Sequence, residues 1–165
     1  MFGVLRVPAV KGQAMAAYDP RAVKGMGTTY ATSAMGADHT AGPTARSPVD
    51  HLDPKGQAAL SLKLQKVITI FDCTGLCLFT SGAVGARLDL VLALLNARYG
   101  WDLDKGWFER MGIETLRDEY RFNELAGFTK TDHRLSEAFT ENALPEVNSV
   151  YDVSEDDIDQ ILVYE

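Results

Sequence analysis

The chain has 165 residues, of which 46% are hydrophobic, and its formal charge is −7. This length and hydrophobic content suffice for one folded domain and exclude disorder throughout. The charge is divided unevenly: residues 1–66 hold eight Lys and Arg against four Asp and Glu, whereas residues 67–165 hold eight against nineteen. An acidic C-terminal half lacks the basic stripe of a nucleic-acid-binding protein, so we expect no nucleic acid as a partner.

The chain contains two cysteines, Cys73 and Cys77. They form no disulfide framework, because a bridge between residues this close would distort the local geometry. We therefore expect a reducing, cytoplasmic setting. The apolar start at residues 1–5 lacks the length and positive charge of a secretory signal, and no run reaches the ~18 apolar residues that a membrane span needs. The sequence predicts a soluble protein without a membrane partner.

Helix-start signals recur twice in the first half of the chain. Asp19-Pro20 combines a capping carboxylate with proline at the first helical position, and predicts a helix over residues 20–35. Its many small residues favour close approach of a backbone or a bulky ligand on one face, with simple tight helix packing as the alternative. After a loop over residues 36–54, Asp53-Pro54 repeats the signal and predicts a largely buried helix that ends at Asp72.

Apolar residues at helical spacing predict two more helices, over residues 88–99 and 104–125, closed by Gly100 and Gly127. The aromatic residues in or beside the second of them are interpreted as a buried stripe rather than a partner surface. These residues are Trp101, Trp107, Tyr120 and Phe122.

The last part of the chain is mainly irregular over residues 128–152, with one helical turn over 135–139. Ser154 and Asp157 resemble a capping box that opens a final helix. Strand signals are confined to residues 2–10. The predicted fold class is therefore mainly α, a multihelical domain over residues 1–165 with a short N-terminal strand.

The segment Asp72-Cys73-Thr74-Gly75-Leu76-Cys77 places a carboxylate and a thiol at one turn between two helical stretches. A thiolate is disfavoured at a helix C-terminus, where the dipole is negative, and a bound metal would supply the missing positive charge. A carboxylate is suited to accept charge-assisted hydrogen bonds. Taken alone, the pattern also fits a structural cysteine with a capping Asp, and we assign that structural role to Cys73.

This segment resembles the cofactor-contacting motif of the tungsten-containing aldehyde ferredoxin oxidoreductases. A second resemblance lies upstream, from Val10-Lys11-Gly12 through Tyr18-Asp19-Pro20-Arg21 to Gly36-Ala37-Asp38-His39. Family members are several times longer. The resemblance therefore implies the C-terminal helical domain of a larger enzyme, without the N-terminal β-rich domain and without the middle segment that carries three further cluster cysteines.

The resemblance also implies roles for single residues. Cys77 would bind a 4Fe-4S cluster, Asp72 would accept hydrogen bonds from a molybdopterin-type cofactor, and Gly75 and Leu76 would complete the cofactor-binding turn. His39 would bind substrate or move protons near the metal, a task for which the near-neutral pKa of imidazole is suited. The alternative for His39 is a helix C-terminal cation. His51 and His133 lie in polar stretches and are interpreted as solvated.

The implied reaction is oxidation of an aldehyde to a carboxylate at a tungsten or molybdenum bis-molybdopterin centre, with electrons leaving through the 4Fe-4S cluster to ferredoxin. The implied partners are ferredoxin, the missing N-terminal part, an aldehyde and, as in some family members, a second copy. One cysteine cannot hold a four-iron cluster, so the isolated chain is expected to be inactive. The alternatives are a split or truncated helical partner without catalysis and an unrelated helical binding protein.

Overall fold

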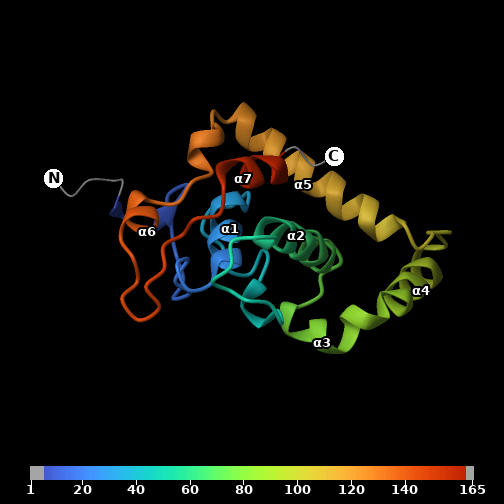
Figure 1. Cartoon of the computed structure of the whole chain (residues 1–165). Coiled ribbons are helices and arrows are strands. Elements are labelled where there is room, and N and C mark those ends of the chain that lie inside the picture. Colours follow the sequence, from blue (N-terminus) through green and yellow to red (C-terminus); the bar gives the residue numbers. More distant parts are fainter. Residues whose placement is uncertain (1–5, 163–165) are drawn as a thin grey trace.

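A computed structural model describes residues 6–162 as a helical assembly around one central helix (Figure 1). This central helix is α1, Lys24–Thr32. The longer helix α2, Gln57–Cys73, packs beside it, and the longest helix, α5, Trp107–Leu125, packs beside α2. The mainly α fold class with a short strand element is confirmed.

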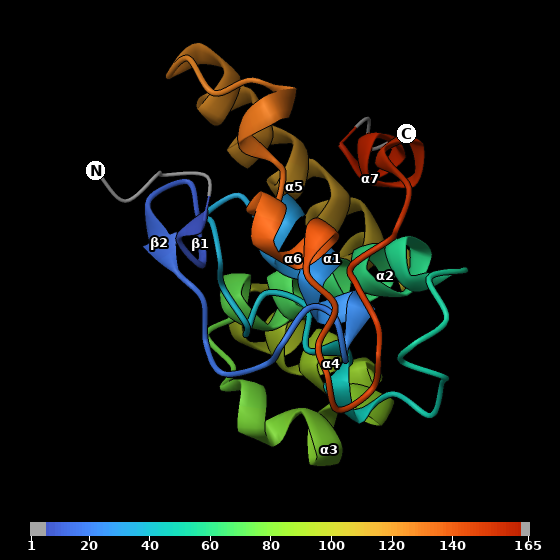
Figure 2. The ribbon, with the colours of Figure 1, turned by 60° about the vertical axis from the view of Figure 1, so that its left-hand side comes forward.

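The strand element is a small hairpin at the N-terminal end of the described chain (Figure 2). Strand β1, Ala9–Val10, pairs antiparallel with β2, Gln13–Ala14, and Val10 lies opposite Gln13. Lys11 and Gly12 form the two-residue turn, with φ values of 49° and 80°, as the tightest hairpins require. The predicted strand signal is thus confirmed at its end, while residues 2–5 lie outside the described residues.

Helix α1 is shorter than predicted, because Asp19-Pro20 starts a turn rather than the helix. The backbone N–H groups of Ala22 and Val23 donate to the Asp19 carbonyl, and its carboxylate accepts from the Arg21 backbone. All nine residues of α1 are buried, including Lys24. Its small residues serve tight packing: a Cβ on Gly27 would lie 2.6 Å from the Tyr151 ring, so neighbouring protein rather than a ligand occupies this face.

The three buried threonines of α1 hydrogen bond both along the helix and to its neighbours. Thr28 Oγ1 lies 3.0 Å from the Tyr151 hydroxyl, and Thr29 Oγ1 lies 2.7 Å from Ser61 Oγ on α2. Gln65 Nε2, also on α2, donates to Thr32 Oγ1 at 2.8 Å. Because buried hydroxyls are costly when unpaired, these contacts fix α2 and the segment at residue 151 against α1.

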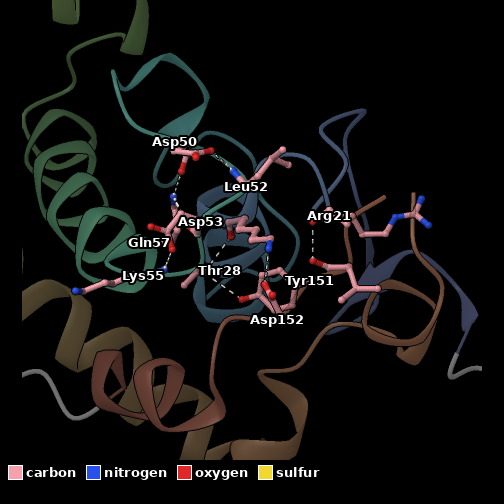
Figure 3. A network of polar contacts seen from close by, with 12 residues as sticks. Arg21, Thr28, Asp50, Leu52, Asp53, Lys55, Gln57, Tyr151 and Asp152 are labelled. Carbon is pink, nitrogen blue, oxygen red and sulfur yellow. Dashed lines mark hydrogen bonds and ion pairs between the residues drawn. The ribbon is translucent and has the colours of Figure 1, made fainter. Parts of the chain in front are cut away.

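A polar network closes the N-terminal end of the bundle (Figure 3). Gln57 Nε2, in the first turn of α2, donates to the Asp50 and Asp53 carbonyls at 2.8 and 3.0 Å. The buried Lys24 ammonium lies 2.5 Å from Asp152 Oδ1. The Lys24 backbone N–H also donates to the His51 carbonyl at 3.2 Å, so the loop over residues 50–56 is fastened to both α2 and α1. The 3₁₀ helix η2, Thr44–Arg46, precedes this loop.

A separate arm leaves α2 at residue 74 and returns to α5. It consists of the 3₁₀ helix η3, Leu78–Thr80, then α3, Ser81–Val84, then η4, Gly85–Arg87, and α4, Leu88–Tyr99. The bounds of α4 and its end at Gly100, with φ of 69°, are as predicted. An apolar cluster of Ile70, Leu92 and Phe108 joins the arm to α2 and α5.

The helical run Leu78–Tyr99 has a mean hydropathy of 1.6, and 6% of its most apolar stretch is buried. By length and composition alone it qualifies as a membrane span, so the prediction that no run is apolar enough was wrong. A single run of this kind is weak evidence for a membrane. The run also changes helix type several times before α4 begins.

The C-terminal part returns to α1 through η5, Lys130–Asp132, α6, Glu137–Glu141, and α7, Glu155–Ile161. The cap predicted at Ser154 is confirmed, since its hydroxyl accepts from the Asp157 N–H at 3.1 Å. Tyr151 and Ile158 join the main apolar cluster with Leu116 and Tyr120 of α5.

Two predictions about aromatic and histidine side chains were wrong. Tyr120 is buried, but Trp101 and Phe122 are 49% and 70% exposed, because the buried face of α5 passes through Leu116 and Asn123 instead. His133 is 5% exposed and stacks on Tyr120, so it is not solvated. Burial, and then the neighbouring Lys11 ammonium, lowers the pKa of His133 to about 4.

The close approach at Gly27 predicts a large stability cost for a small change. Gly27→Ala forces the Tyr151 ring and Pro20 to move, and we expect a loss of about 1–3 kcal/mol in the free energy of unfolding. Urea unfolding followed by circular dichroism measures it. Gly82→Ala is the matched control, because a Cβ there meets no atom within 4 Å. Equal stability of the two variants would refute the packing role of α1.

The buried His133 predicts an acid-sensitive fold. Its folded pKa of about 4 lies below the ordinary histidine pKa of 6.5, so the unfolded chain binds the proton more readily between these values. Stability is therefore retained above pH 6.5 and falls as pH drops toward 4, by at most about 3 kcal/mol from this residue. Melting temperatures of wild type and His133→Phe over this range check it, and parallel curves would contradict it.

Candidate functional site

The C-terminal end of α2 carries the turn that the sequence singled out. The Gly75 N–H donates to the Asp72 carbonyl at 3.1 Å, and the Leu76 N–H donates to the Phe71 carbonyl at 2.8 Å. These two bonds, with Gly75 at φ of 72°, make a Schellman motif, which ends a helix by means of a left-handed glycine. The predicted glycine turn is thus present, and it directs the chain from Asp72 to Cys77.

A cavity of about 180 Å³ lies beside this turn, between the end of α1, α2 and α5. Three carboxylates line it: Asp38 from the loop after α1, Asp72 from α2 and Glu119 from α5. Partial burial, and then the charge of Asp38, raises the pKa of Asp72. Partial burial, and then the charge of Asp72, raises the pKa of Glu119. The cavity is therefore a site of concentrated negative charge that favours hydrogen-bond donors or protons.

The Asp72 carboxylate itself accepts no hydrogen bond from residues 6–162, whereas Asp38 accepts two from Thr40. Thr40 N and Thr40 Oγ1 both lie 2.8 Å from Asp38 Oδ1. Asp38 is thus held by its own loop, and Asp72 retains its capacity as an acceptor.

Both cysteines are free thiols on the surface. Cys73 Sγ lies 3.6 Å from Thr115 Oγ1 at the cavity wall. Cys77 follows the glycine turn and immediately precedes η3, and its carbonyl accepts from Thr80 N and Thr80 Oγ1 at 2.9 and 2.6 Å. These backbone bonds hold the Cys77 main chain while leaving its thiol exposed. Cys73 is more exposed than a purely structural assignment requires.

His39 directly follows Asp38 in the sequence, but unlike Asp38 it does not line the cavity. Its ring stacks on Tyr18, with the ring centroids 6.1 Å apart, and Nδ1 is 4.0 Å from Asp38 Oδ1. About half of its side chain is exposed. The structure therefore brings Asp38 and Asp72 together and leaves His39 open to solvent.

Within residues 6–162, no group of three or more His, Cys, Asp or Glu side chains is placed to hold a metal ion. Cys77 therefore belongs to no ready-made metal site in the described part of the chain. The Lys11 ammonium donates to the Ala31 and Ser33 carbonyls at 3.0 and 2.9 Å, where it caps α1. Burial lowers the pKa of Lys11 to about 8.

Sequence reasoning missed Glu119 and Thr115, which form the α5 wall of the cavity. They are four residues apart and therefore share one face of the helix. Each lies next to a buried residue, Leu116 or Tyr120, so they occupy the edge of the buried face. That spacing is the signal that would have marked them as boundary residues.

Residues 6–163 match the family model described as "Aldehyde ferredoxin oxidoreductase, domains 2 & 3". The chain is similar to the tungsten-containing aldehyde ferredoxin oxidoreductase of Thermococcus kodakarensis, with 32% identity over 149 residues, 84% of this chain and 24% of the relative. It is 33% identical to the Pyrococcus furiosus protein of the same name over 148 residues, 83% of this chain and 24% of that protein. The chain thus spans about a quarter of the relatives' length, in their C-terminal part.

The negative charge of the cavity predicts that replacing one of its carboxylates by a neutral side chain stabilises the folded chain, and that this gain depends on pH. Because the folded pKa of Asp72 is raised above 3.8, its proton is held more tightly in the folded chain, and stability is lost as pH rises through that folded value. Asp72→Asn should therefore stabilise the free chain at pH 7, by less than about 1 kcal/mol given its exposure, and not below pH 3.8. Thermal melts at both pH values test this, with Asp118→Asn on exposed α5 surface as the control. Destabilisation at pH 7 would contradict it.

Proposed function

Because the chain belongs to the aldehyde ferredoxin oxidoreductase family, we propose that it is the C-terminal part of an enzyme that oxidises aldehydes to carboxylic acids. The reaction centre is a tungsten, or molybdenum, bis-molybdopterin cofactor, and a 4Fe-4S cluster passes the electrons to ferredoxin. The observation that carries the proposal is the turn at Gly75, which presents an unpaired carboxylate and an exposed thiol within the region matched to the family.

In this proposal Asp72 orients the pterin. Its carboxylate accepts no hydrogen bond from the described residues, and partial burial beside Asp38 raises its pKa. The N–H groups of the pterin ring would donate the hydrogen bonds that the Asp72 carboxylate lacks, and they would stabilise its negative charge. Hydrogen bonds to an ionised acceptor are stronger than those between neutral groups. Gly75 and Leu76 form the backbone of the turn, and nothing lies within 4 Å of a Cβ built on Gly75, so a bulky ring system has room there.

Cys77 is the cluster ligand in this proposal. Its thiol is exposed on a main chain fixed by Thr80, which suits a ligand that must meet a metal supplied from outside. A four-iron cluster needs about four ligands, and the chain has two cysteines. The other ligands therefore come from the upstream part of the enzyme. When bound, the pterin metal and the cluster supply the redox chemistry, while the protein positions them.

His39 is proposed to bind the aldehyde or to move a proton during its oxidation. Its imidazole is about half exposed and is oriented by stacking on Tyr18, so it is accessible to a substrate that approaches the Asp38 side of the cavity. An imidazole carries one nitrogen that donates and one that accepts a proton, which suits a general acid–base role. Asp38, bonded to Thr40, supports the loop from which His39 projects.

The isolated chain is proposed to be inactive. One exposed cluster thiol, and no metal-binding group within residues 6–162, favour a second candidate function as a helical partner without catalysis of its own. In both readings the partner is the upstream part of a family enzyme. The proposal also includes ferredoxin as the electron acceptor and a homodimer as one form of assembly. The proposed location is the cytoplasm, because two free surface thiols suit a reducing compartment.

Substitution of the two cysteines separates these readings. The chain is co-expressed without oxygen with the upstream part of the Pyrococcus furiosus relative, and iron, tungsten and pterin are measured in the purified complex. We expect Cys77→Ala to abolish most of the cluster iron, because it removes a ligand. Cys73→Ala, an equally exposed neighbour, should retain it. Equal metal content in both variants, or metal in neither variant nor wild type, would leave only the helical-partner reading.

A further inference from the structure

Residues 90–95 of helix α4, between Asp89 and Asn96, are apolar on every side but are covered on only one. Leu88, Leu92 and Leu95 pack toward the cluster of Ile70 and Phe108, and Leu92 is the buried residue of the helix. Leu90 and Leu94, four residues apart and therefore on one face, are 48% and 69% exposed. A helix that is hydrophobic all round is normally buried all round.

The exposed apolar surface extends to both ends of the arm. At its start, Phe79 of η3 is 85% exposed. At its end, Tyr99 and Trp101 are 56% and 49% exposed and stack on each other with centroids 4.6 Å apart. We call these residues, with Leu90 and Leu94, the arm surface. Figure 1 shows the arm at the end of the molecule away from the hairpin and α6. Large apolar side chains exposed along one arm are typical of a surface that another molecule covers.

We propose that the arm surface docks onto the upstream polypeptide of the family enzyme, an inference that rests on the proposed function. The matched relatives extend well beyond this chain, which covers 24% of their length. The surface begins two residues after Cys77, whose thiol would need cluster ligands from outside the described residues. The polypeptide that brings those ligands to Cys77 must approach the chain at Phe79.

A lipid bilayer fits this surface less well. Helix α4 has 12 residues, or roughly 18 Å at about 1.5 Å per residue, against a hydrocarbon core of about 30 Å. The backbone at Arg87, with φ of −130° and ψ of 37°, separates α4 from the preceding turns. Insertion would also pull Leu92 out of its cluster with Ile70 and Phe108.

The test uses the full chain co-expressed with an affinity-tagged upstream part of the Pyrococcus furiosus relative. Phe79→Glu and Leu94→Glu place a charge on the arm surface, and Val147→Glu places one at an exposed apolar residue on the loop between α6 and α7. We expect wild type and Val147→Glu to copurify with the tagged part, and the other two variants to be retained about tenfold less or worse, since a buried unpaired charge is costly. Circular dichroism checks that all four chains fold.

Equal retention of all four chains would overturn the inference. Iron measured in the same complexes tests the proposed function separately, because cluster binding at Cys77 does not require the arm surface to be the docking site. Complexes that depend on Phe79 and Leu94 but contain no iron would support the docking surface and remove the redox role. Failure of the wild-type chain to copurify would overturn the inference as well. Flotation of the chain with phosphatidylcholine vesicles, or a dimer that Leu94→Glu dissociates in sedimentation velocity, would then identify what covers the arm surface.

Discussion

The structure depends on the burial of a polar helix. Every residue of α1 is buried, yet three of its nine residues are threonines and one is a lysine. Each buried hydroxyl and the buried ammonium need a partner, because an unpaired polar group in the interior costs roughly 1–3 kcal/mol. Ser61 and Gln65 on α2 meet this need on one side, and Tyr151 and Asp152 meet it on another. The positions of these segments around α1 are thus specified by hydrogen bonds as well as by apolar packing.

This constraint also sets the position of the candidate site. Gln65 is tied to Thr32 two turns before the end of α2, so the helix delivers Asp72 to a fixed place beside the loop that carries Asp38. The Schellman motif at Gly75 then fixes the direction of the chain toward Cys77. Helix α5 completes the cavity with Glu119, held against α2 by the close contact of Gly112 with the Lys66 carbonyl, 3.0 Å from an added Cβ. The cavity is thus walled by α2, α5 and the segment after α1.

Local signals in the sequence predicted local structure well. The end of α4 at Gly100, the glycine turn at Gly75 and the cap at Ser154 depend on a few adjacent residues, and all three are present in the structure. The burial of α1 and of His133 was not predictable in the same way, because polar residues are buried only where distant segments supply their partners or their cover. The cavity wall at Glu119 likewise arises from how α5 crosses α2. The roles of His39, Asp72 and Cys77 came from resemblance to a family, and they stay predictions.

The arm from η3 to α4 is joined to the rest of the molecule by an apolar cluster distinct from the two that surround α1 and α7. An element held by one such cluster can open locally at a lower free energy than the whole domain, as a separate cooperative unit. The turn from Asp72 to Cys77 lies at the hinge of that unit, since α2 ends there and the arm begins. In the proposed enzyme, a polypeptide that covers the arm would also order the turn from Asp72 to Cys77, so that assembly of the enzyme and retention of its cofactor would stabilise each other.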